Sequence, residues 1–293
     1  MKILLSLSIL ETISSEHYSG HYPEPGKSKL HLTDSTLLVS EYIDSGASTR
    51  VFTGTQSDRI SSRMPKEVAI KCISTRNSHL QTRIEHEYRV LKALESVQNL
   101  RIPRAYYVSN QWSCGGSHMC QFLVLTKAGP DFSRIVSRNP FGLSKAARRA
   151  KPGQFELFVS SVGLCVVTEL EKLHRAGAIH GDVGQYNVAN DLFDQRQVML
   201  IDFGQGRLKS ELSANEFARR AERDFRRANA FVQRLIKSKM SLDYGVTSMK
   251  SLLENPLFAL VSKIYDDQKE LKQVLSDFIL KEFGIPFAGR IMY

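Results

Sequence analysis

The pattern of apolar and polar positions changes once along the chain. From Ser35 to about residue 126, short runs rich in β-branched and aromatic residues predominate, as expected for strands: TLLVSEYI, RVFTGT, EVAIKCI, RAYYVS and CQFLVLT. One helical stretch, about residues 81–97, interrupts them. After Gly129 and Pro130 the periodicity is mostly helical, with a long apolar helix expected over 154–176. The pattern predicts an α+β protein with a β-rich first part and a compact, mainly helical second part.

The change of pattern also predicts the organisation of the chain. Residues 14–34 are rich in Ser, His, Tyr, Pro and Gly, so we expect residues 1–34 to be an N-terminal extension. We expect a first lobe over 35–128 and a second lobe over 129–293, joined near residues 126–131. The two lobes would together form a single domain.

Charge adds a statement about partners. The 293 residues have a formal net charge of +10, which favours acidic partners, nucleic acid or anionic surfaces. Two basic clusters, 144–153 and 219–227, offer an acidic peptide or an RNA backbone a binding surface, although a solvated face is the interpretation we favour for both. No tract is long and apolar enough for a transmembrane segment.

The expected compartment is cytoplasmic or nuclear. The four cysteines do not have the spacing of a disulfide framework, which fits a reducing compartment. The first ten residues, MKILLSLSIL, contain one lysine and a short apolar run, so an N-terminal signal sequence stays open as an alternative. No clear small-residue cleavage motif follows, and a strand or docking segment is the reading we favour.

Three segments carry residues suited to phosphate chemistry. VAIK ends in Lys71, HGDVGQYN spans 180–187, and LIDFG ends at residues 202–204. Lys71 ends a predicted strand, so its cation has a fixed direction toward phosphates, and such a lysine usually needs a carboxylate to hold it. In the helix that follows, Glu87 shares the face of Ile84, Leu91 and Leu94, so we predict Glu87 as the partner. Glu85 lies with Arg89 and Lys92 on the wetter face.

The acidic and amide residues of the later segments suit transfer and metal binding. The H-x-D-x-x-x-x-N pattern of 180–187 resembles that of protein kinases, which implies that Asp182 accepts a hydrogen bond from a substrate hydroxyl and orients it for attack. Asn187 and Asp202 offer oxygen atoms, which Mg²⁺ prefers as ligands. An isolated Asp or Asn more often caps a helix or starts a turn, but that alternative does not predict the combined spacing.

Together, in this order, these motifs resemble the protein-kinase superfamily over about residues 35–235. The resemblance implies a bilobal protein-kinase-like fold, ATP and Mg²⁺ as cofactors, and catalytic roles for Asp182, Lys71 and Asn187. It implies a metal role for Asn187 and Asp202, and main-chain contacts to adenine next to a gatekeeper at Leu125. The nucleotide-binding positions that it implies are Gly46, Ala47, Ser48, Val51, Ala69, Lys71, Glu87, Lys127 and Ala128.

The details resemble compact atypical kinases. Gly181 stands where conventional protein kinases have the arginine of H-R-D, and no A-P-E motif follows Gly204. The H-G-D form resembles the small kinase of the KEOPS complex and the aminoglycoside and choline phosphotransferases, and the Q-Y-N ending resembles RIO kinases. Asp224 would be the buried aspartate of the next large helix or a solvated helix position, and both readings stay open.

The function that these observations predict is ATP-dependent phosphate transfer, most simply by a Ser/Thr protein kinase acting on a protein substrate. Two alternatives stay open. One is a small-molecule kinase of the aminoglycoside or choline type. The other is a non-catalytic scaffold with a kinase fold, which the loss of two glycines from the phosphate loop favours and the presence of all five core polar residues opposes.

Overall fold

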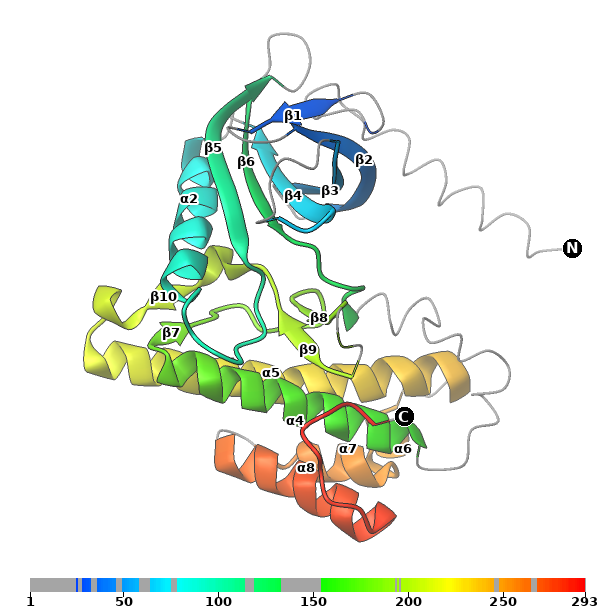
Figure 1. Ribbon diagram of the computed structural model, residues 1–293. Helices are drawn as coiled ribbons and strands as arrows, with labels where there is room; N and C mark the ends of the chain where they lie inside the picture. The colour runs from blue at the N-terminus through cyan, green and yellow to red at the C-terminus, as the bar shows by residue number, and fades with distance from the viewer. Residues whose placement is uncertain are drawn as a thin grey trace, which may run out of the picture. The chain divides into compact units, whose positions relative to one another are not determined.

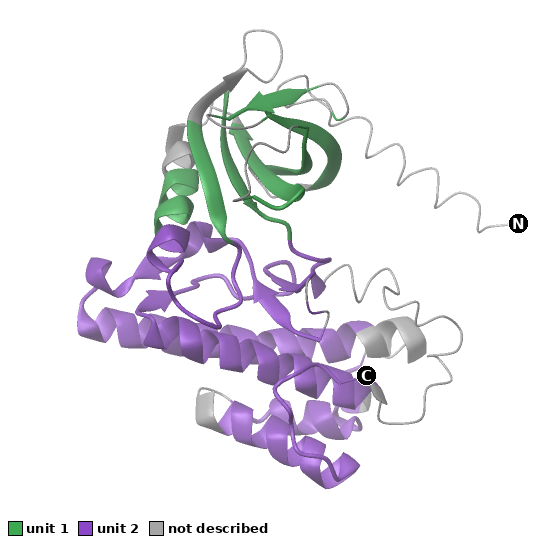
Figure 2. Cartoon of the chain, viewed as in Figure 1, with its two compact units in different colours: residues 1–89, 104–127 green, residues 90–103, 128–293 purple. Residues whose placement is uncertain are grey.

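The chain divides into two compact units in the computed structural model (Figure 2). The first contains residues 1–89 and 104–127, and the second contains residues 90–103 and 128–293. The structure describes residues 25, 28–32, 36–45, 49–57, 64–74, 78–113, 119–132, 154–192, 194, 196–244, 248–264 and 268–292.

The first unit is a curled antiparallel sheet with one helix (Figure 1). The six strands lie in the order β1-β2-β3-β4-β6-β5. Their bounds are β1 Lys29–His31, β2 Thr36–Ser45, β3 Arg50–Gln56, β4 Glu67–Ser74, β5 Ala105–Ser113 and β6 Met119–Thr126, and helix α2 spans Ser78–Ala93. The strands and the helix predicted between residues 35 and 126 are therefore present.

Alternation along β4 separates the core of this unit from the face that carries Lys71. Val68, Ile70 and Cys72 are fully buried in a cluster with Phe52 and Phe122. Side chains at alternate positions of a strand point to opposite faces of the sheet. Ala69 and Lys71 therefore point to the other face, and the core on one side fixes the position of the lysine on the other.

The second unit is built on two long helices, α4 Gln154–Arg175 and α5 Ala214–Tyr244. A β-carbon at Gly163 of α4 would come within 2.8 Å of both Val232 of α5 and Leu275 of α8, so glycine permits close packing of the three helices. The remaining elements are β7 Ala178–Ile179, β8 Val188–Asn190, β9 Val198–Leu200, β10 Arg207–Leu208, α6 Met249–Leu253, α7 Pro256–Val261 and α8 Gln268–Phe283.

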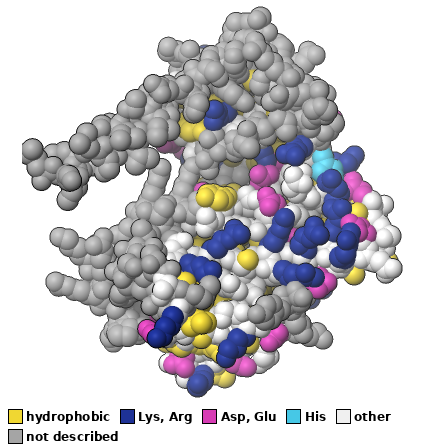
Figure 3. Space-filling view, turned by 180° about the vertical axis from the view of Figure 1, so that it is seen from behind, with side chains coloured by type: hydrophobic (Ala, Val, Ile, Leu, Met, Phe, Trp, Pro, Cys, Tyr) yellow, Lys and Arg dark blue, Asp and Glu magenta, His cyan; other side chains and the backbone are white. Residues whose placement is uncertain are grey.

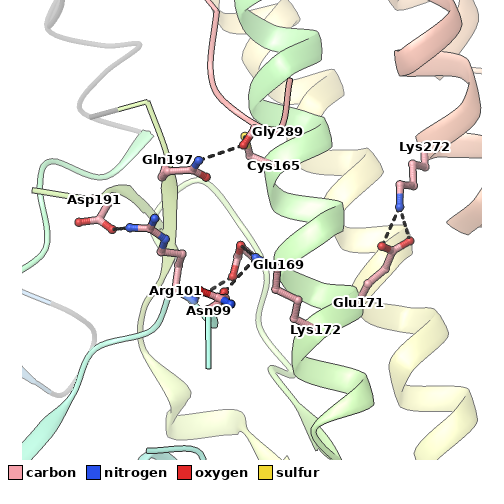
Figure 4. Close-up of polar contacts among 10 residues, drawn as sticks. All are labelled: Asn99, Arg101, Cys165, Glu169, Glu171, Lys172, Asp191, Gln197, Lys272 and Gly289. Atoms are coloured by element: carbon pink, nitrogen blue, oxygen red, sulfur yellow. Dashed lines mark hydrogen bonds and ion pairs between the residues drawn. The ribbon is translucent and has the colours of Figure 1, made fainter. Parts of the chain in front are cut away.

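Two boundaries differ from the sequence-based ones. Strand β1 lies inside the predicted extension 1–34, because Leu30 is buried in the core of the first sheet. Residues 90–103 lie in the second unit although they fall inside the predicted lobe 35–128. Polar contacts explain their placement (Figure 4): the amide of Arg101 donates to Glu169 of α4 at 2.8 Å, and Lys172 donates to the carbonyl of Asn99 at 2.9 Å.

Two further observations concern the compartment and membrane predictions. Cys72 and Cys165 are free and buried, whereas Cys120 is disulfide-bonded, a feature that the cysteine spacing did not predict. Among the described residues, no helix combines the length and the apolar character that crossing a bilayer requires.

Candidate active site

A buried ion pair lies at the centre of the first unit. Lys71 Nζ is 2.6 Å from Glu87 Oε2, and the two side chains are 9% and 2% exposed. Glu85, the alternative partner, is exposed on the same helix and accepts a hydrogen bond from Gln121 at 3.1 Å. The predicted pairing of Lys71 with Glu87 is therefore present, because the face of α2 that carries Ile84 and Val90 packs inward.

The register of the sheet brings other predicted nucleotide-binding positions to the face of Lys71. Val51 of β3 is the direct partner of Lys71, and Leu125 of β6 is the partner of Ala69. Paired residues lie on one side of a sheet, and so do residues two positions apart along a strand. The structure thus gathers Val51, Ala69, Lys71 and Leu125 on one face. Gly46, Ala47 and Ser48 lie outside the described residues.

Lys127 and Ala128 follow the end of β6, where the first unit ends. Lys127 Nζ donates to Glu67 Oε2 at 3.1 Å, so its side chain is directed to the start of β4. On either side, the amide of Thr126 donates to the carbonyl of Arg104 and the amide of Gly129 donates to that of Asn190. The adenine contact of the Lys127 and Ala128 main chain stays a prediction.

In the second unit, the β8–β9 hairpin places Asn187 and Asp202 at neighbouring ends. Residue Val188 pairs with Leu200, and the amide of Ile201 donates to the carbonyl of Asn187 at 2.9 Å. The side-chain amide of Asn187 donates to Asp182 twice, to the main-chain oxygen at 2.7 Å and to Oδ2 at 3.0 Å. These bonds orient Asp182 and direct the Asn187 amide nitrogen toward it. They do not use the Asn187 Oδ1 atom, which could therefore coordinate a metal ion.

Asp202 has a backbone conformation that non-glycine residues rarely adopt. Its φ is 63° and its ψ is 77°, in the left-handed region. Its Oδ1 accepts from the amide of Gly204 at 3.2 Å, which compensates in part for the local strain. Non-glycine residues in this region cluster at functional sites, so the conformation itself marks Asp202 as a candidate.

His180 links the loop of residues 180–187, the candidate catalytic loop, to this hairpin end. Its ring is fully buried, Nδ1 accepts from the amide of Asp182 at 3.2 Å, and Nε2 lies 3.0 Å from the carbonyl of Ile201. An amide can only donate and a carbonyl can only accept, so the ring is neutral with its proton on Nε2. Burial lowers the pKa of His180 and favours the same neutral form.

Asp224 of α5 caps the main chain of the catalytic loop. Its carboxylate accepts from the amides of His180 and Gly181, both at 2.9 Å, and lies 3.1 Å from Nε2 of His174. The side chain is fully buried. Of the two readings that the sequence left open for Asp224, the buried structural aspartate is correct and the solvated position is wrong.

Gly181 is required by both its backbone and its surroundings. Its φ is +80°, and a β-carbon there would collide with the carbonyl oxygen of Gln205. Arg227 of α5 donates to the Gly181 carbonyl, and its Nη1 lies 3.2 Å from Asp182 Oδ1. A guanidinium therefore reaches the catalytic loop from a helix 46 positions later, a contact that a basic cluster in sequence did not reveal.

The donor set of the second unit fits Mg²⁺. Asn187 and Asp202 supply amide and carboxylate oxygens, the hard ligands that this ion prefers, and neither nitrogen nor sulfur ligands are needed. Asn187 Oδ1 is left for a ligand because the amide nitrogen is bound to Asp182.

Comparisons with known proteins concern the fold and the family resemblance of the chain. A model of the RIO domain matches residues 158–244, less than a third of the 293 residues but including all of the catalytic loop, Asp202 and Asp224. None of the curated proteins matches significantly. The crystal structure of the BubR1 kinase domain is similar with a TM-score of 0.56 and 14% identity, over 95% of this chain and 92% of that chain.

The identity to the solved structure is low, so that likeness speaks for the fold alone. The fold class expected from the sequence, α+β with a β-rich first lobe and a helical second lobe, is confirmed. The chain has a bilobal protein-kinase-like fold, and it resembles RIO kinases over the segment that carries Asp182, Asn187 and Asp202.

Proposed function

We propose that this protein is an ATP- and Mg²⁺-dependent phosphotransferase that transfers the γ-phosphoryl group to a Ser or Thr hydroxyl of a protein substrate. The observation that carries the proposal is the intact polar set: the buried Lys71–Glu87 pair in one unit, and Asp182 oriented by Asn187 in the other. The RIO-domain match and the kinase-like fold support a kinase-like phosphotransferase in general.

On the nucleotide side, Lys71 would hold phosphate oxygens and Glu87 would hold Lys71. The 2.6 Å pair fixes the direction of the ammonium group before ATP binds, which reduces the rearrangement needed on binding. Val51 and Ala69 would supply the apolar surface beside the adenine ring on the same sheet face. Main-chain groups of Lys127 and Ala128 would form hydrogen bonds with the polar edge of the adenine ring.

On the acceptor side, Asp182 would accept the hydrogen bond of the acceptor hydroxyl. The bond from the γ-phosphorus to the bridging oxygen of ADP breaks, the hydroxyl oxygen forms the new bond to phosphorus, and the hydroxyl proton passes to the Asp182 carboxylate. Asn187 and Asp202 would hold Mg²⁺, which neutralises charge on the phosphate oxygens. The Asp182 side chain is 53% exposed, so a segment of another protein can reach it.

The test is phosphate transfer from γ-labelled ATP by the purified full chain, with a panel of protein, peptide and small-alcohol acceptors. We expect Mg²⁺-dependent labelling of a protein or peptide acceptor and its loss in Asp202→Ala. Labelling of small alcohols alone would favour an aminoglycoside- or choline-type kinase. Nucleotide binding without any transfer would favour a non-catalytic scaffold, and activity that persists with a chelator would overturn the metal assignment.

A further inference from the structure

Helix α5 presents a row of arginines next to its buried face. Arg220, Arg223 and Arg227 are spaced by three and four residues, so they lie along one side of the helix. Asp224, which caps the catalytic loop, lies on the adjoining buried face. The cap therefore holds the arginine row beside Asp182. Seen from behind, the helical unit has many lysine and arginine side chains gathered on its surface (Figure 3).

The row lines a pocket in the second unit. The pocket has a volume of about 280 Å³, and its lining residues are Gly181, Asp182, Gln205, Arg220, Arg223 and Arg227. Three guanidinium groups and one carboxylate therefore surround it. A cavity with this excess of positive charge next to the candidate catalytic carboxylate is suited to an anionic group.

The other charges of the helix leave this pocket positive. Arg219 pairs with Glu216, and Arg226 pairs with Glu222 at 2.8 Å. Arg220 donates only its Nε to Glu216, at 2.6 Å, so its terminal nitrogens are not used in that bond. Among the described residues, none forms an ion pair with the exposed Arg223. Glu216 is thus shared by Arg219 and Arg220, and Arg227 pairs with Asp182, so Arg223 is the pocket arginine to which the described residues supply no ion-pair partner.

We propose that this arginine pocket binds an anionic group of the protein acceptor, a phosphate or a carboxylate close to the hydroxyl that is phosphorylated. This inference rests on the proposed function and specifies its substrate class: acceptor segments with a phosphorylated or acidic residue near the acceptor Ser or Thr. Arginine suits this role because its planar guanidinium binds carboxylate and phosphate oxygens in pairs. The proximity of Asp182 places the anion and the hydroxyl on the same segment.

The shape of the site favours a protein over RNA as the acceptor. RNA and single-stranded nucleic acids bind along extended basic grooves in which aromatic side chains stack on bases. Here three arginines converge on one pocket, and the residues that line it include no aromatic side chain. A single anionic side chain fits this pocket better than a repeating phosphate backbone.

The first experiment measures binding, which does not require catalysis. Fluorescence anisotropy of a labelled peptide with phosphoserine three positions from an acceptor serine is compared with the same peptide carrying Glu or Ala there. We expect the wild-type chain to bind the phosphorylated and acidic peptides about five- to tenfold more tightly than the Ala peptide, and Arg223→Glu to abolish this preference. Arg223→Gln serves as the milder variant should charge reversal disturb the fold.

The matched control is Arg226→Ala. Arg226 lies on the same helix and is exposed, but it pairs with Glu222 and does not line the pocket. We expect this variant to keep the peptide preference. Equal loss of preference in Arg223→Gln and Arg226→Ala would overturn the proposal, because the effect would then come from the general charge of the helix. Arginine-dependent binding of an RNA oligomer, with no preference among the peptides, would also overturn it.

The second experiment measures transfer to the same three peptides and separates the two hypotheses. Arginine-dependent binding without transfer to any acceptor would uphold the pocket and overturn the proposed phosphotransferase function. Transfer to all three peptides at equal rates, with equal affinities, would uphold the phosphotransferase and overturn the pocket. Faster transfer to the phosphorylated and acidic peptides, lost in Arg223→Gln, is the result that we expect.

Discussion

The two units hold their reactive side chains by different physical means. In the first, Lys71 forms a buried ion pair with Glu87, and both groups are almost fully removed from water. In the second, Asp182 is 53% exposed and is held through its main chain and its neighbour Asn187. The main chain is held in turn by the buried carboxylate of Asp224 and the neutral ring of His180.

The difference fits the role that we propose for each side chain. A lysine that is proposed to bind nucleotide phosphates would benefit from a fixed direction, and the buried carboxylate of Glu87 helps to provide it. A carboxylate that accepts a hydrogen bond from an incoming substrate hydroxyl has to stay accessible. In the second unit, hydrogen bonds fix the backbone beneath Asp182 and its side chain stays exposed. The Lys71–Glu87 arrangement is therefore sensitive to loss of a charge. The Asp182 arrangement is sensitive to loss of the side chains that accept hydrogen bonds from the main chain around it.

The largest effect that we expect is on turnover. Asp182→Asn keeps the shape of the exposed side chain but removes the proton acceptor, so transfer should fall by about 10²- to 10⁴-fold. Nucleotide binding and the unfolding transition should change little, because the caps lie beneath the residue. The measurement is ATP-dependent transfer alongside thermal unfolding. Asp194→Asn, in the β8–β9 turn, is the matched control; a fully active Asp182→Asn would contradict the assignment.

The next effect tests the buried ion pair of the first unit. Glu87→Ala removes the carboxylate that pairs with the buried Lys71 ammonium, and removing one member of a buried pair costs about 3–5 kcal/mol. We expect a loss of this order in the free energy of unfolding of the first unit, measured by chemical denaturation.

Glu85→Ala is the control, since Glu85 is exposed on the same helix and, among the described residues, accepts a hydrogen bond from Gln121. We expect it to cost less than about 1 kcal/mol. Equal losses for the two variants would show that the ion pair has no special role.

A smaller effect tests the main-chain hydrogen bonds that Asp224 accepts in the second unit. Asp224→Ala leaves the amides of His180 and Gly181 without their acceptor, at about 1–3 kcal/mol for an unsatisfied buried group. Turnover should fall with stability, because Asp182 loses its support. Glu222→Ala, an exposed change two positions earlier, is the control and should lower neither the stability nor the turnover. A stable Asp224→Ala with normal turnover would show that the caps do not position the loop.

The neutral His180 ring predicts a pH dependence of stability. Burial lowers its pKa from the usual 6.5, so below that pH the unfolded chain binds a proton that the folded chain does not. Stability should therefore decrease as the pH falls below about 6.5, by up to about 1.4 kcal/mol per pH unit. The measurement is denaturant unfolding between pH 7.5 and 5. An unchanged slope in His180→Gln would assign the effect to other groups.

The smallest expected effect concerns phosphorylation of the segment after Gly204. Ser210 and Ser213 are exposed, and an exposed ion pair formed there contributes only about 0–1 kcal/mol. Phosphatase treatment should therefore change transfer by less than about fivefold. Ser210→Ala with Ser213→Asn removes both acceptors and keeps a cap for α5, since Ser213 Oγ accepts from the amide of Glu216. A large loss in both preparations would reveal a phosphorylation switch.

Much of the fold was predictable because it depends on local patterns. Alternation in EVAIKCI gave β4 and the direction of Lys71, and three- and four-residue spacing on α2 distinguished Glu87 from Glu85. The order and spacing of the VAIK, HGD and DFG segments identified the candidate residues of both units.

What the sequence did not reveal depends on contacts between distant residues. The assignment of residues 90–103 to the second unit depends on Glu169, whose burial is not apparent from its own helix. Arg227 belongs to a basic run that resembles any solvated helix face, and only the packing of α5 under the catalytic loop brings it to Asp182. The nucleotide roles of Gly46, Ala47 and Ser48 stay predictions, as do those of Val51, Ala69, Lys127 and Ala128.

Gly181 limits how this protein can change over evolutionary time. An arginine at this position would require a left-handed backbone and would bring a β-carbon into the Gln205 carbonyl, so the missing H-R-D arginine cannot return by one substitution. The neighbouring cation, Arg227, is instead carried by a helix whose exposed positions tolerate exchange. Variation in what this protein recognises is therefore expected to arise on α5, while the loop of residues 180–187 stays fixed.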